Sequence, residues 1–154
     1  MRVRDLMVRT VKTCSPEMNL AAVAEQLWKA GCGALPVVDK SRVLGMITDR
    51  DICIALGTRN QKASEVLVRD VSLPKLFYCA PDEDIHGALQ IMSAQKVRRL
   101  PVIDKRGALE GILCLDDIVL FAEEKASGLT YCDVIETMKS ICDHSEVLKS
   151  LATR

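Results

Sequence analysis

The strongest limit on the fold of this chain is that its pattern occurs twice. When the sequence is shifted by 65 residues, "TCSPEMNLAAVAEQL" aligns with "YCAPDEDIHGALQIM", and "GALPVVDK" aligns with "RRLPVIDK". After one additional residue in the following turn, "GMITDRDI" aligns with "GILCLDDI". Since a repeated pattern indicates a repeated structural unit, we expect two copies of one small fold within these 154 residues.

Both copies predict the same order of elements. In the first, apolar residues recur at helical spacing, and Gly31 is placed to end that helix. The residues of this stripe are Leu20, Val23, Ala24, Leu27 and Trp28. Two short apolar strands follow, "LPVVD" and "VLGMIT", joined by a polar turn. In the second copy Gly107 can adopt the positive φ that a hairpin turn favours.

A further helix follows the hairpin in each copy. We expect it to end at Gly57 in the first copy and at Gly128 in the second, because glycine commonly follows a helix C-terminus. Each copy therefore reads strand, helix, strand, strand, helix. This order predicts an α/β (α+β) fold made of two tandem repeats.

The predicted boundaries follow from the repeat. The first copy covers residues 1–57, the connection 58–62, the second copy 63–124, and a helical tail 125–154. The tail carries an apolar stripe at helical spacing, which comprises Val134, Ile135, Met138, Ile141, Cys142, Leu148 and Leu151. We expect this stripe to cover the protein's own core or that of a symmetric partner. Its polar face mixes charge signs, which disfavours a membrane-surface helix.

The balance of charges and the length of the apolar runs limit the classes of partner that this chain can bind. Twenty-one basic residues balance twenty-one acidic ones, so the chain has no overall field that would concentrate it on a nucleic acid. No apolar run reaches the roughly eighteen residues that a membrane span requires. The first ten residues, "MRVRDLMVRT", are too charged for a secretory signal. We therefore expect a cytoplasmic protein without a nucleic-acid or membrane partner.

The seven cysteines do not suggest a disulfide framework. Their number is odd, they form no C-x-x-C motif, and most lie within apolar runs. In a reducing compartment we expect them to behave as small, mostly buried hydrophobic residues. The two histidines, His86 and His144, lie far apart and lack ligand spacing, so no metal site is expected.

The segment "GMITDRDI" ends an apolar strand with four polar residues, Thr48, Asp49, Arg50 and Asp51. A helix start explains them without any ligand. Thr48 or Asp49 can accept hydrogen bonds from free backbone N–H groups, and acids in a first turn suit the helix dipole. The second copy ends its strand in a related way, which favours an additional, shared role.

Taken together, these motifs resemble the CBS domain, a small regulatory module that normally occurs as an intramolecular pair. The resemblance rests on "V-x-D-L-M", "T-x-S-P", "G-A-L-P-V-V-D" and "G-M-I-T-D-R-D-I", and it covers about residues 1–124. It implies that the two repeats form a pseudo-two-fold pair with two clefts. Such a pair often stacks with a second pair, so we expect a homodimer. In this family the clefts bind adenosyl compounds such as AMP, ADP, ATP or S-adenosylmethionine.

The resemblance assigns residues to a first cleft. Thr48 and Asp51 match the family's ribose-binding pair. An ionised Asp can accept from both ribose hydroxyls, and such charged hydrogen bonds contribute about 1.5–3 kcal/mol. Arg50 can reach phosphate oxygens, aided by free N–H groups at the helix start. Since each family site is shared between repeats, the resemblance places Val97 near the base and Arg98 near the phosphate.

The second cleft departs from the family pattern. Asp117 occupies the ribose position, but Cys114 replaces the threonine and Asp116 replaces the arginine. A thiol is a weak hydrogen-bonding group, and a second carboxylate repels phosphate. The residues expected opposite are Thr10, Cys32 and Gly33, which bring no positive charge. We expect one competent site at Asp51, whereas the other is either empty or selective for an uncharged tail such as that of adenosine.

The resemblance implies a regulatory module that senses energy state or stress, has no obligatory cofactor and acts on a regulated protein partner. A ligand-free dimeric scaffold is the alternative. An enzyme is disfavoured because the chain shows no nucleophile–base pair, no metal-ligand set and no glycine-rich phosphate loop. Cys114 lies near Asp117 in the sequence, but no histidine in that motif could activate its thiol.

Overall fold

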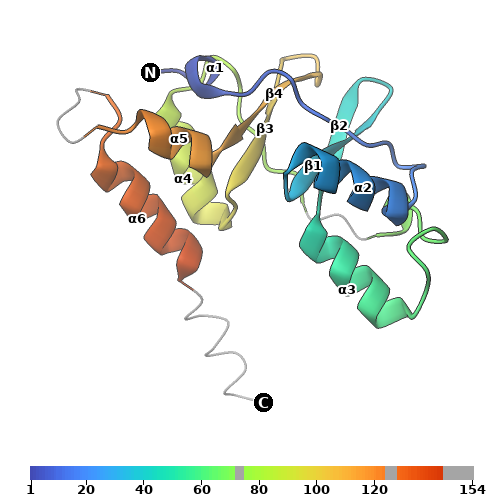
Figure 1. The fold of residues 1–154 in the computed structure, drawn as a ribbon. Helices are drawn as coiled ribbons and strands as arrows, with labels where there is room; N and C mark the ends of the chain where they lie inside the picture. The colour runs from blue at the N-terminus through green and yellow to red at the C-terminus, as the bar shows by residue number, and fades with distance from the viewer. Residues whose placement is uncertain (72–74, 124–127, 144–154) are drawn as a thin grey trace. The chain divides into compact units, whose positions relative to one another are not determined.

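The computed structural model describes residues 1–71, 75–123 and 128–143 (Figure 1). The chain divides into two compact units. Each unit consists mainly of one sequence repeat and includes a short segment of the other repeat. Unit 1 combines Met1–Arg9, Phe77–Val102 and Glu110–Arg154, and unit 2 combines Thr10–Leu76 and Ile103–Leu109. The mixture of helices and two-stranded sheets confirms the expected α+β class. The repeat boundaries near residues 57, 62 and 124 stay predictions.

Unit 2 contains the first predicted hairpin. Strands β1 (Ala34–Asp39) and β2 (Arg42–Thr48) pair antiparallel and place Ala34 opposite Thr48. Lys40 and Ser41 connect them with φ values of 44° and 68°. Positive φ at both central residues gives the turn the twist of the flanking strands, so this hairpin forms without a glycine.

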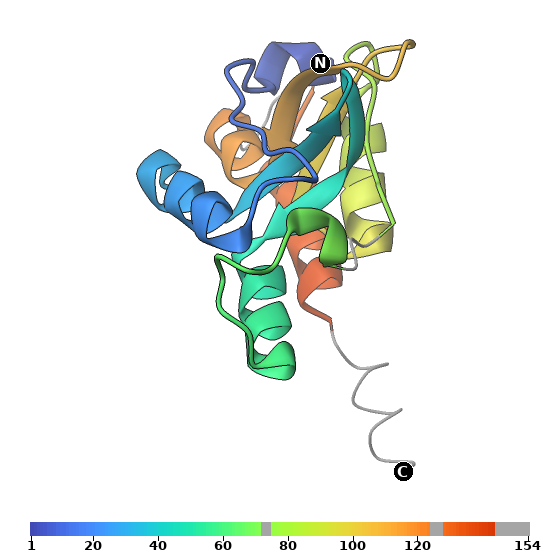
Figure 2. The same ribbon diagram turned by 90° about the vertical axis from the view of Figure 1, so that its right-hand side faces the viewer.

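Two helices flank this hairpin in the sequence. Helix α2 (Leu20–Ala30) ends at Gly31, whose φ of 62° confirms the predicted stop. Helix α3 (Asp49–Arg59) continues directly from β2 (Figure 2) and runs through Gly57 to a left-handed Asn60. The predicted end at Gly57 is therefore wrong. A glycine inside a helix costs only about 1 kcal/mol, and asparagine also adopts the left-handed conformation that ends a helix.

The core of unit 2 draws on residues before and after the hairpin. Its buried members are Cys14, Leu20, Val23, Leu27, Leu35, Val37, Ile47, Ile52, Ala55, Val66, Val68 and Val71. Two members of the predicted stripe lie outside it, because Ala24 is exposed and Trp28 has 87% of its surface exposed. The expected opening strand is reduced to one parallel bridge between Cys14 and Val37.

Unit 1 also contains a two-stranded hairpin, but a different set of helices packs around it. Its elements are α1 (Val3–Leu6), α4 (Ile85–Gln95), α5 (Leu115–Phe121), α6 (Tyr131–Cys142) and most of β3 (Arg99–Ile103) and β4 (Leu109–Cys114). The end residues Ile103 and Leu109 of these strands, and the turn between them, belong to unit 2. A parallel bridge between Cys79 and Val102 again replaces the opening strand. Gly107 has the expected positive φ, 87°. The end of α5 was wrongly predicted at Gly128, because the extended, buried Ala122 already leaves the helix.

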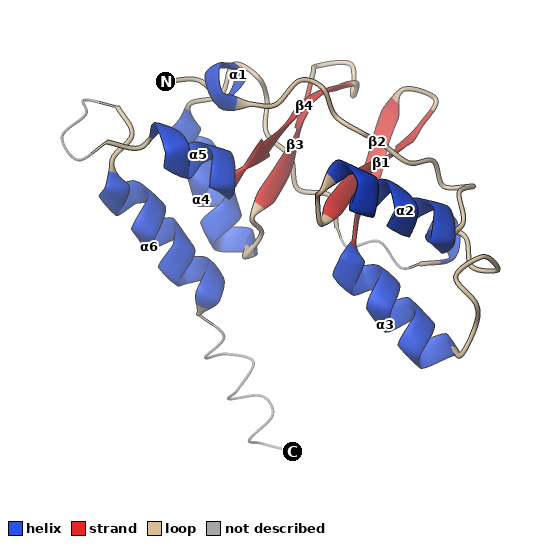
Figure 3. Ribbon diagram, in the orientation of Figure 1, coloured by secondary structure: helices blue, strands red, loops and turns tan. Residues whose placement is uncertain are grey.

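Helix α6 shows where the apolar tail stripe lies. It packs against α4 and α5 in unit 1 (Figure 3). Val134 and Ile141 are buried in that unit's core, whereas Ile135 and Met138 are exposed by 54% and 37%. The expectation that the stripe covers its own core is thus confirmed for one side of the helix. The predicted members Leu148 and Leu151 lie outside the described residues.

The cysteines are less buried than expected. Cys14 and Cys79 are buried, and burial raises their thiol pKa values to about 11 and about 12. Cys32 and Cys114 are half-buried, and the exposed ones are Cys53, Cys132 and Cys142. The expectation of a mostly buried set was wrong because the exposed thiols lie on helix faces turned away from the cores.

Candidate functional site

The junction of β2 and α3 in unit 2 is held by a reciprocal set of hydrogen bonds. The Thr48 N–H and hydroxyl both donate to Oδ2 of Asp51, at 2.9 and 2.7 Å. The Asp51 N–H in turn donates to Oγ1 of Thr48 at 3.1 Å. This arrangement is a capping box, which satisfies backbone donors at the start of α3. The helix-start interpretation of this motif is therefore confirmed.

The capping box leaves part of Asp51 available. Both bonds that its carboxylate accepts end on Oδ2, and within the described residues Oδ1 accepts none. An ionised carboxylate offers about four lone-pair positions, so acceptor capacity remains for a ligand hydroxyl. The neighbouring Arg50 is exposed, and its guanidinium forms no ion pair with any described residue. The junction thus combines a free carboxylate oxygen with an available cation.

Asp49 is a neighbour that sequence reasoning did not assign to a site. Its N–H donates to the Gly33 carbonyl at 3.1 Å, which ties the start of α3 to the residue before β1. A Cβ at Gly33 would lie 3.2 Å from the Asp49 carboxylate, so this approach is close. The second carboxylate at the helix start is exposed and lowers the local attraction for phosphate.

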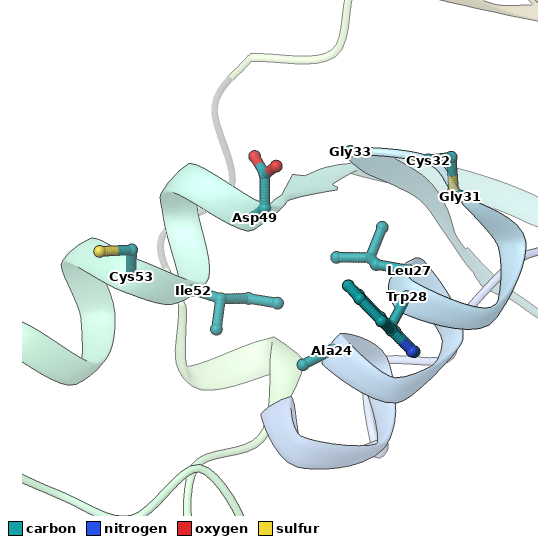
Figure 4. Close-up of a pocket in the computed structure, with 9 residues that line it drawn as sticks. All are labelled: Ala24, Leu27, Trp28, Gly31, Cys32, Gly33, Asp49, Ile52 and Cys53. Carbon is teal, nitrogen blue, oxygen red and sulfur yellow. The ribbon is translucent and has the colours of Figure 1, made fainter.

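A groove lies between α2 and α3, next to this junction. It has a volume of about 550 Å³, and its lining residues are Ala24, Leu27, Trp28, Gly31, Cys32, Gly33, Asp49, Ile52 and Cys53. Ile52 of α3 points toward Leu27 and Trp28 of α2 (Figure 4). Sequence reasoning missed this groove because helical spacing grouped Trp28 with Leu27 and did not indicate which of the two side chains is exposed. The groove is mostly apolar, and Asp49 is the acidic residue in its lining.

The loop that precedes β3 in unit 1 holds the predicted base and phosphate contacts. Val97 is half-buried, and its N–H donates to the Met92 carbonyl at 3.0 Å. Arg98 is exposed, and its carbonyl accepts from the Leu115 N–H at 2.9 Å. The Nη2 of Arg98 also approaches the Cys142 Sγ at 3.9 Å.

The second junction, between β4 and α5, lacks the box seen in the first. Cys114 precedes α5 but makes no side-chain capping bond at the start of this helix. Burial, followed by the nearby Asp117 carboxylate, raises the pKa of the Cys114 thiol to about 11. Asp116 in the first turn of α5 is exposed. This junction presents carboxylates without an accompanying cation from its own motif.

The predicted site residues divide between the two units. Unit 2 contains Thr48, Arg50 and Asp51, together with Thr10, Cys32 and Gly33. Unit 1 contains Val97, Arg98, Cys114, Asp116 and Asp117. Within unit 2 the structure brings Thr48 into contact with Asp51, and the exposed Thr10 is not among the residues that line the groove.

The family model of the CBS domain matches the sequence twice, over residues 3–58 and 68–124. The chain belongs to the CBS domain family. Among its relatives, CBS domain-containing protein YhcV of Bacillus subtilis is 32% identical over 131 residues, which cover 83% of this chain and 92% of YhcV. Hypoxic response protein 1 of Mycobacterium tuberculosis is 29% identical over 140 residues, 90% of this chain and 92% of that protein.

Two solved structures extend the comparison of this CBS pair. Hypoxic Response Protein I, crystallised with two coordinated zinc ions, matches with a TM-score of 0.72 and 29% identity over 80% of this chain and all of that one. The CBS pair of protein MJ0100, in complex with 5′-methylthioadenosine and S-adenosylmethionine, matches with a TM-score of 0.70 and 24% identity. That match covers 79% of this chain and 94% of the chain that contains the MJ0100 CBS pair, and it shows the shared fold alone.

Within the described parts of this CBS pair, no three His, Cys, Asp or Glu side chains gather closely enough to hold a metal ion. Among the same residues, none of the helices has the length and apolar character that crossing a membrane would require.

Proposed function

We propose that this CBS pair is a regulatory module that binds an adenosyl ligand and performs no catalysis. The observation that carries the proposal is the Oδ1 oxygen of Asp51, which stands outside the capping box at the start of α3. It occurs in a family in which MJ0100 was crystallised with two adenosyl compounds. We propose that such binding lets this CBS pair act as an energy or stress sensor that regulates a protein partner.

The chemistry of Asp51 fits the part that these ligands share. AMP, ADP, ATP and S-adenosylmethionine all carry an adenosine ribose, whose two neighbouring hydroxyls are hydrogen-bond donors. The ionised Asp51 carboxylate would accept from them, at about 1.5–3 kcal/mol for hydrogen bonds to a charged group. The Thr48 hydroxyl is already engaged with Asp51 and would orient the carboxylate. Arg50 would face a phosphate, if the ligand carries one.

Residues of the other repeat would complete the site, as is usual for the family. We propose that Val97 contacts the base and that Arg98 contacts the phosphate. The equivalent cleft headed by Asp117 would bind more weakly, because Cys114 forms no capping box and Asp116 replaces the arginine. An uncharged tail such as that of adenosine would suit that cleft better than a triphosphate.

The test is calorimetric titration of the purified protein with AMP, ADP, ATP, S-adenosylmethionine and adenosine. We expect at least one of these ligands to bind. Asp51→Ala should weaken that binding about tenfold to a hundredfold, and Asp117→Ala should change it much less. Equal losses in both variants would refute the asymmetry. Absence of binding by the parent protein would favour the alternative, a ligand-free dimeric scaffold.

We further propose that the protein forms a homodimer through exposed helical faces. Apolar side chains remain exposed on helices of both units, for example Trp28 by 87% and Leu120 by 81%. Large apolar side chains exposed on helices are candidates for burial in such an interface. Sedimentation at micromolar concentration should show a dimer, and a single species of 17 kDa would contradict the proposal.

A further inference from the structure

Helix α6 contacts the loop that contains Arg98, the residue proposed to bind the phosphate of the ligand. This helix lies beyond the second CBS match, which ends at residue 124. The Cys142 thiol at the last helical residue accepts from Nη2 of Arg98 at 3.9 Å. The carbonyl of the next residue, Asp143, accepts from Nζ of Lys96. Two cations of the loop are therefore held by one helix end.

The position of that helix end is determined by packing within unit 1. Val134, Thr137 and Ile141 of α6 are each at most 5% exposed. At the other end of α6, Oδ2 of Asp133 lies 3.6 Å from Nε2 of His86, which belongs to α4. Because Ile141 is anchored in the core, the adjacent Cys142 has little freedom to leave the loop. The contact with Arg98 is thus a property of the docked helix.

The partner that α6 offers to Arg98 is a weak one. A thiol is a poor hydrogen-bond acceptor, whereas a phosphate oxygen forms short, charge-assisted bonds with a guanidinium. A bound phosphate would therefore outcompete Cys142 for the same group. The exposed Arg98 side chain can change partner without disturbing the core.

We propose that the end of α6 is an autoinhibitory contact, in which Cys142 holds Arg98 back until a phosphate-bearing ligand takes it. This inference rests on the proposed function, since it assigns Arg98 to the ligand phosphate. Cys142 is then a positioning residue that acts through Arg98. Because coupling between two sites is reciprocal, a ligand that removes Arg98 from Cys142 must also weaken the contact between this loop and the end of α6. Ligand binding would therefore change the environment of the C-terminal helix.

The first test strengthens the contact. Cys142→Asp gives Arg98 a carboxylate partner, and an exposed ion pair of this kind should weaken ATP binding up to about fivefold. Adenosine binding should not change, because adenosine has no phosphate. Cys132→Asp is the matched control, since it makes the same charge change at another exposed thiol of α6. In an Arg98→Ala background, Cys142→Asp should have no further effect on ATP binding.

The second test measures the reciprocal effect. Saturating ATP should lower the rate at which a neutral maleimide labels Cys142, because a neighbouring guanidinium favours the reactive thiolate and ATP would withdraw it. Adenosine should leave that rate unchanged, and the labelling rate of Cys132 should stay constant with either ligand. If ATP binds the parent and Cys142→Asp behaves like Cys132→Asp, the inference is overturned and the proposed function stands. If no phosphate-bearing ligand binds the parent, the assignment of Arg98 to phosphate fails, and the inference fails with it.

Discussion

Replacing Asp51 by alanine would separate its structural role from its proposed binding role, because the chain contains a second copy of the same capping box. At the start of α6, the Thr130 N–H and hydroxyl donate to Oδ2 of Asp133 at 2.8 and 2.6 Å. The Asp133 N–H returns a bond to Thr130 at 3.3 Å. Asp133→Ala therefore removes nearly the same capping hydrogen bonds as Asp51→Ala at a place where no ligand is proposed, together with one exposed contact, at 3.6 Å, to Nε2 of His86.

The expected magnitudes differ between stability and binding. Loss of a helix cap typically costs about 0.5–2 kcal/mol of folding free energy. Both carboxylates are half-buried, so water can replace part of the lost bonds, and about 1 kcal/mol is reasonable for each variant. In a chain of this size that corresponds to a fall in Tm of about 2–4 °C. Asp51→Ala should lose a further 1.5–3 kcal/mol of ligand binding, or about tenfold to a hundredfold in Kd.

The assay combines thermal unfolding of the ligand-free proteins with calorimetric titration of each variant, using the tightest ligand found for the parent. We expect similar shifts in Tm for the two variants and a loss of affinity for Asp51→Ala alone. If Asp133→Ala lost as much affinity, the binding defect would reflect helix destabilisation in general. If Asp51→Ala kept the parent affinity, its carboxylate would be only a helix cap, and the ribose assignment would be refuted.

Three other outcomes follow from the structure. Cys14 and Cys79, whose pKa values burial raises to about 11 and about 12, should react with a thiol reagent at pH 7 only after unfolding; labelling of either in the native state would contradict their burial. Ile141→Ala should cost about 2–5 kcal/mol of stability in a denaturant titration, because the side chain is 5% exposed. Ile135→Ala, at 54% exposure on the same helix, should stay within about 0.5 kcal/mol of the parent, and equal losses would mean that α6 is docked differently. The Thr130 hydroxyl and backbone lower the pKa of Asp133, so its contribution to stability should be present above about pH 4 and should disappear as pH falls through the lowered pKa. Thr130→Ala should reduce this acid sensitivity in a pH series of melting temperatures.

The elements with a strong local determinant were predictable from the sequence. Gly31 and Gly107 occupy the left-handed positions that the helix stop and the hairpin turn require. Helix ends without such a determinant were not predictable. Asn60 ends α3 three residues after the glycine that was expected to do so, and α5 ends where Ala122 turns into the core. The end of α5 depends on tertiary packing, which a local sequence pattern does not contain, whereas for α3 the pattern offered two local stops, Gly57 and Asn60, and did not decide between them.

Exposure was predicted less well than secondary structure. Helical spacing put Trp28 in the same stripe as Leu27, yet Leu27 is 5% exposed and Trp28 is 87% exposed. Neighbouring residues on a helix lie about 100° apart around its axis. A stripe with five members therefore includes side chains at its edge that do not face the core. The same geometry exposes Ile135 beside the buried Val134. Which edge of a stripe is covered depends on the partner helix, which the spacing cannot reveal.

The candidate site illustrates a related limit, because T-x-x-D occurs twice in this chain with nearly the same hydrogen bonds. Thr48 and Asp51 begin α3, and Thr130 and Asp133 begin α6. Neither the tetrapeptide nor the capping box can therefore identify a ribose site. The surroundings distinguish the two boxes. Asp51 follows the end of β2 and has the exposed Arg50 beside it, whereas Oδ2 of Asp133 lies 3.6 Å from Nε2 of His86 on a neighbouring helix. A carboxylate that already faces a helix partner is suited to hold two helices together, and one that follows a strand end next to a free cation is suited to bind a ligand with hydroxyl and phosphate groups.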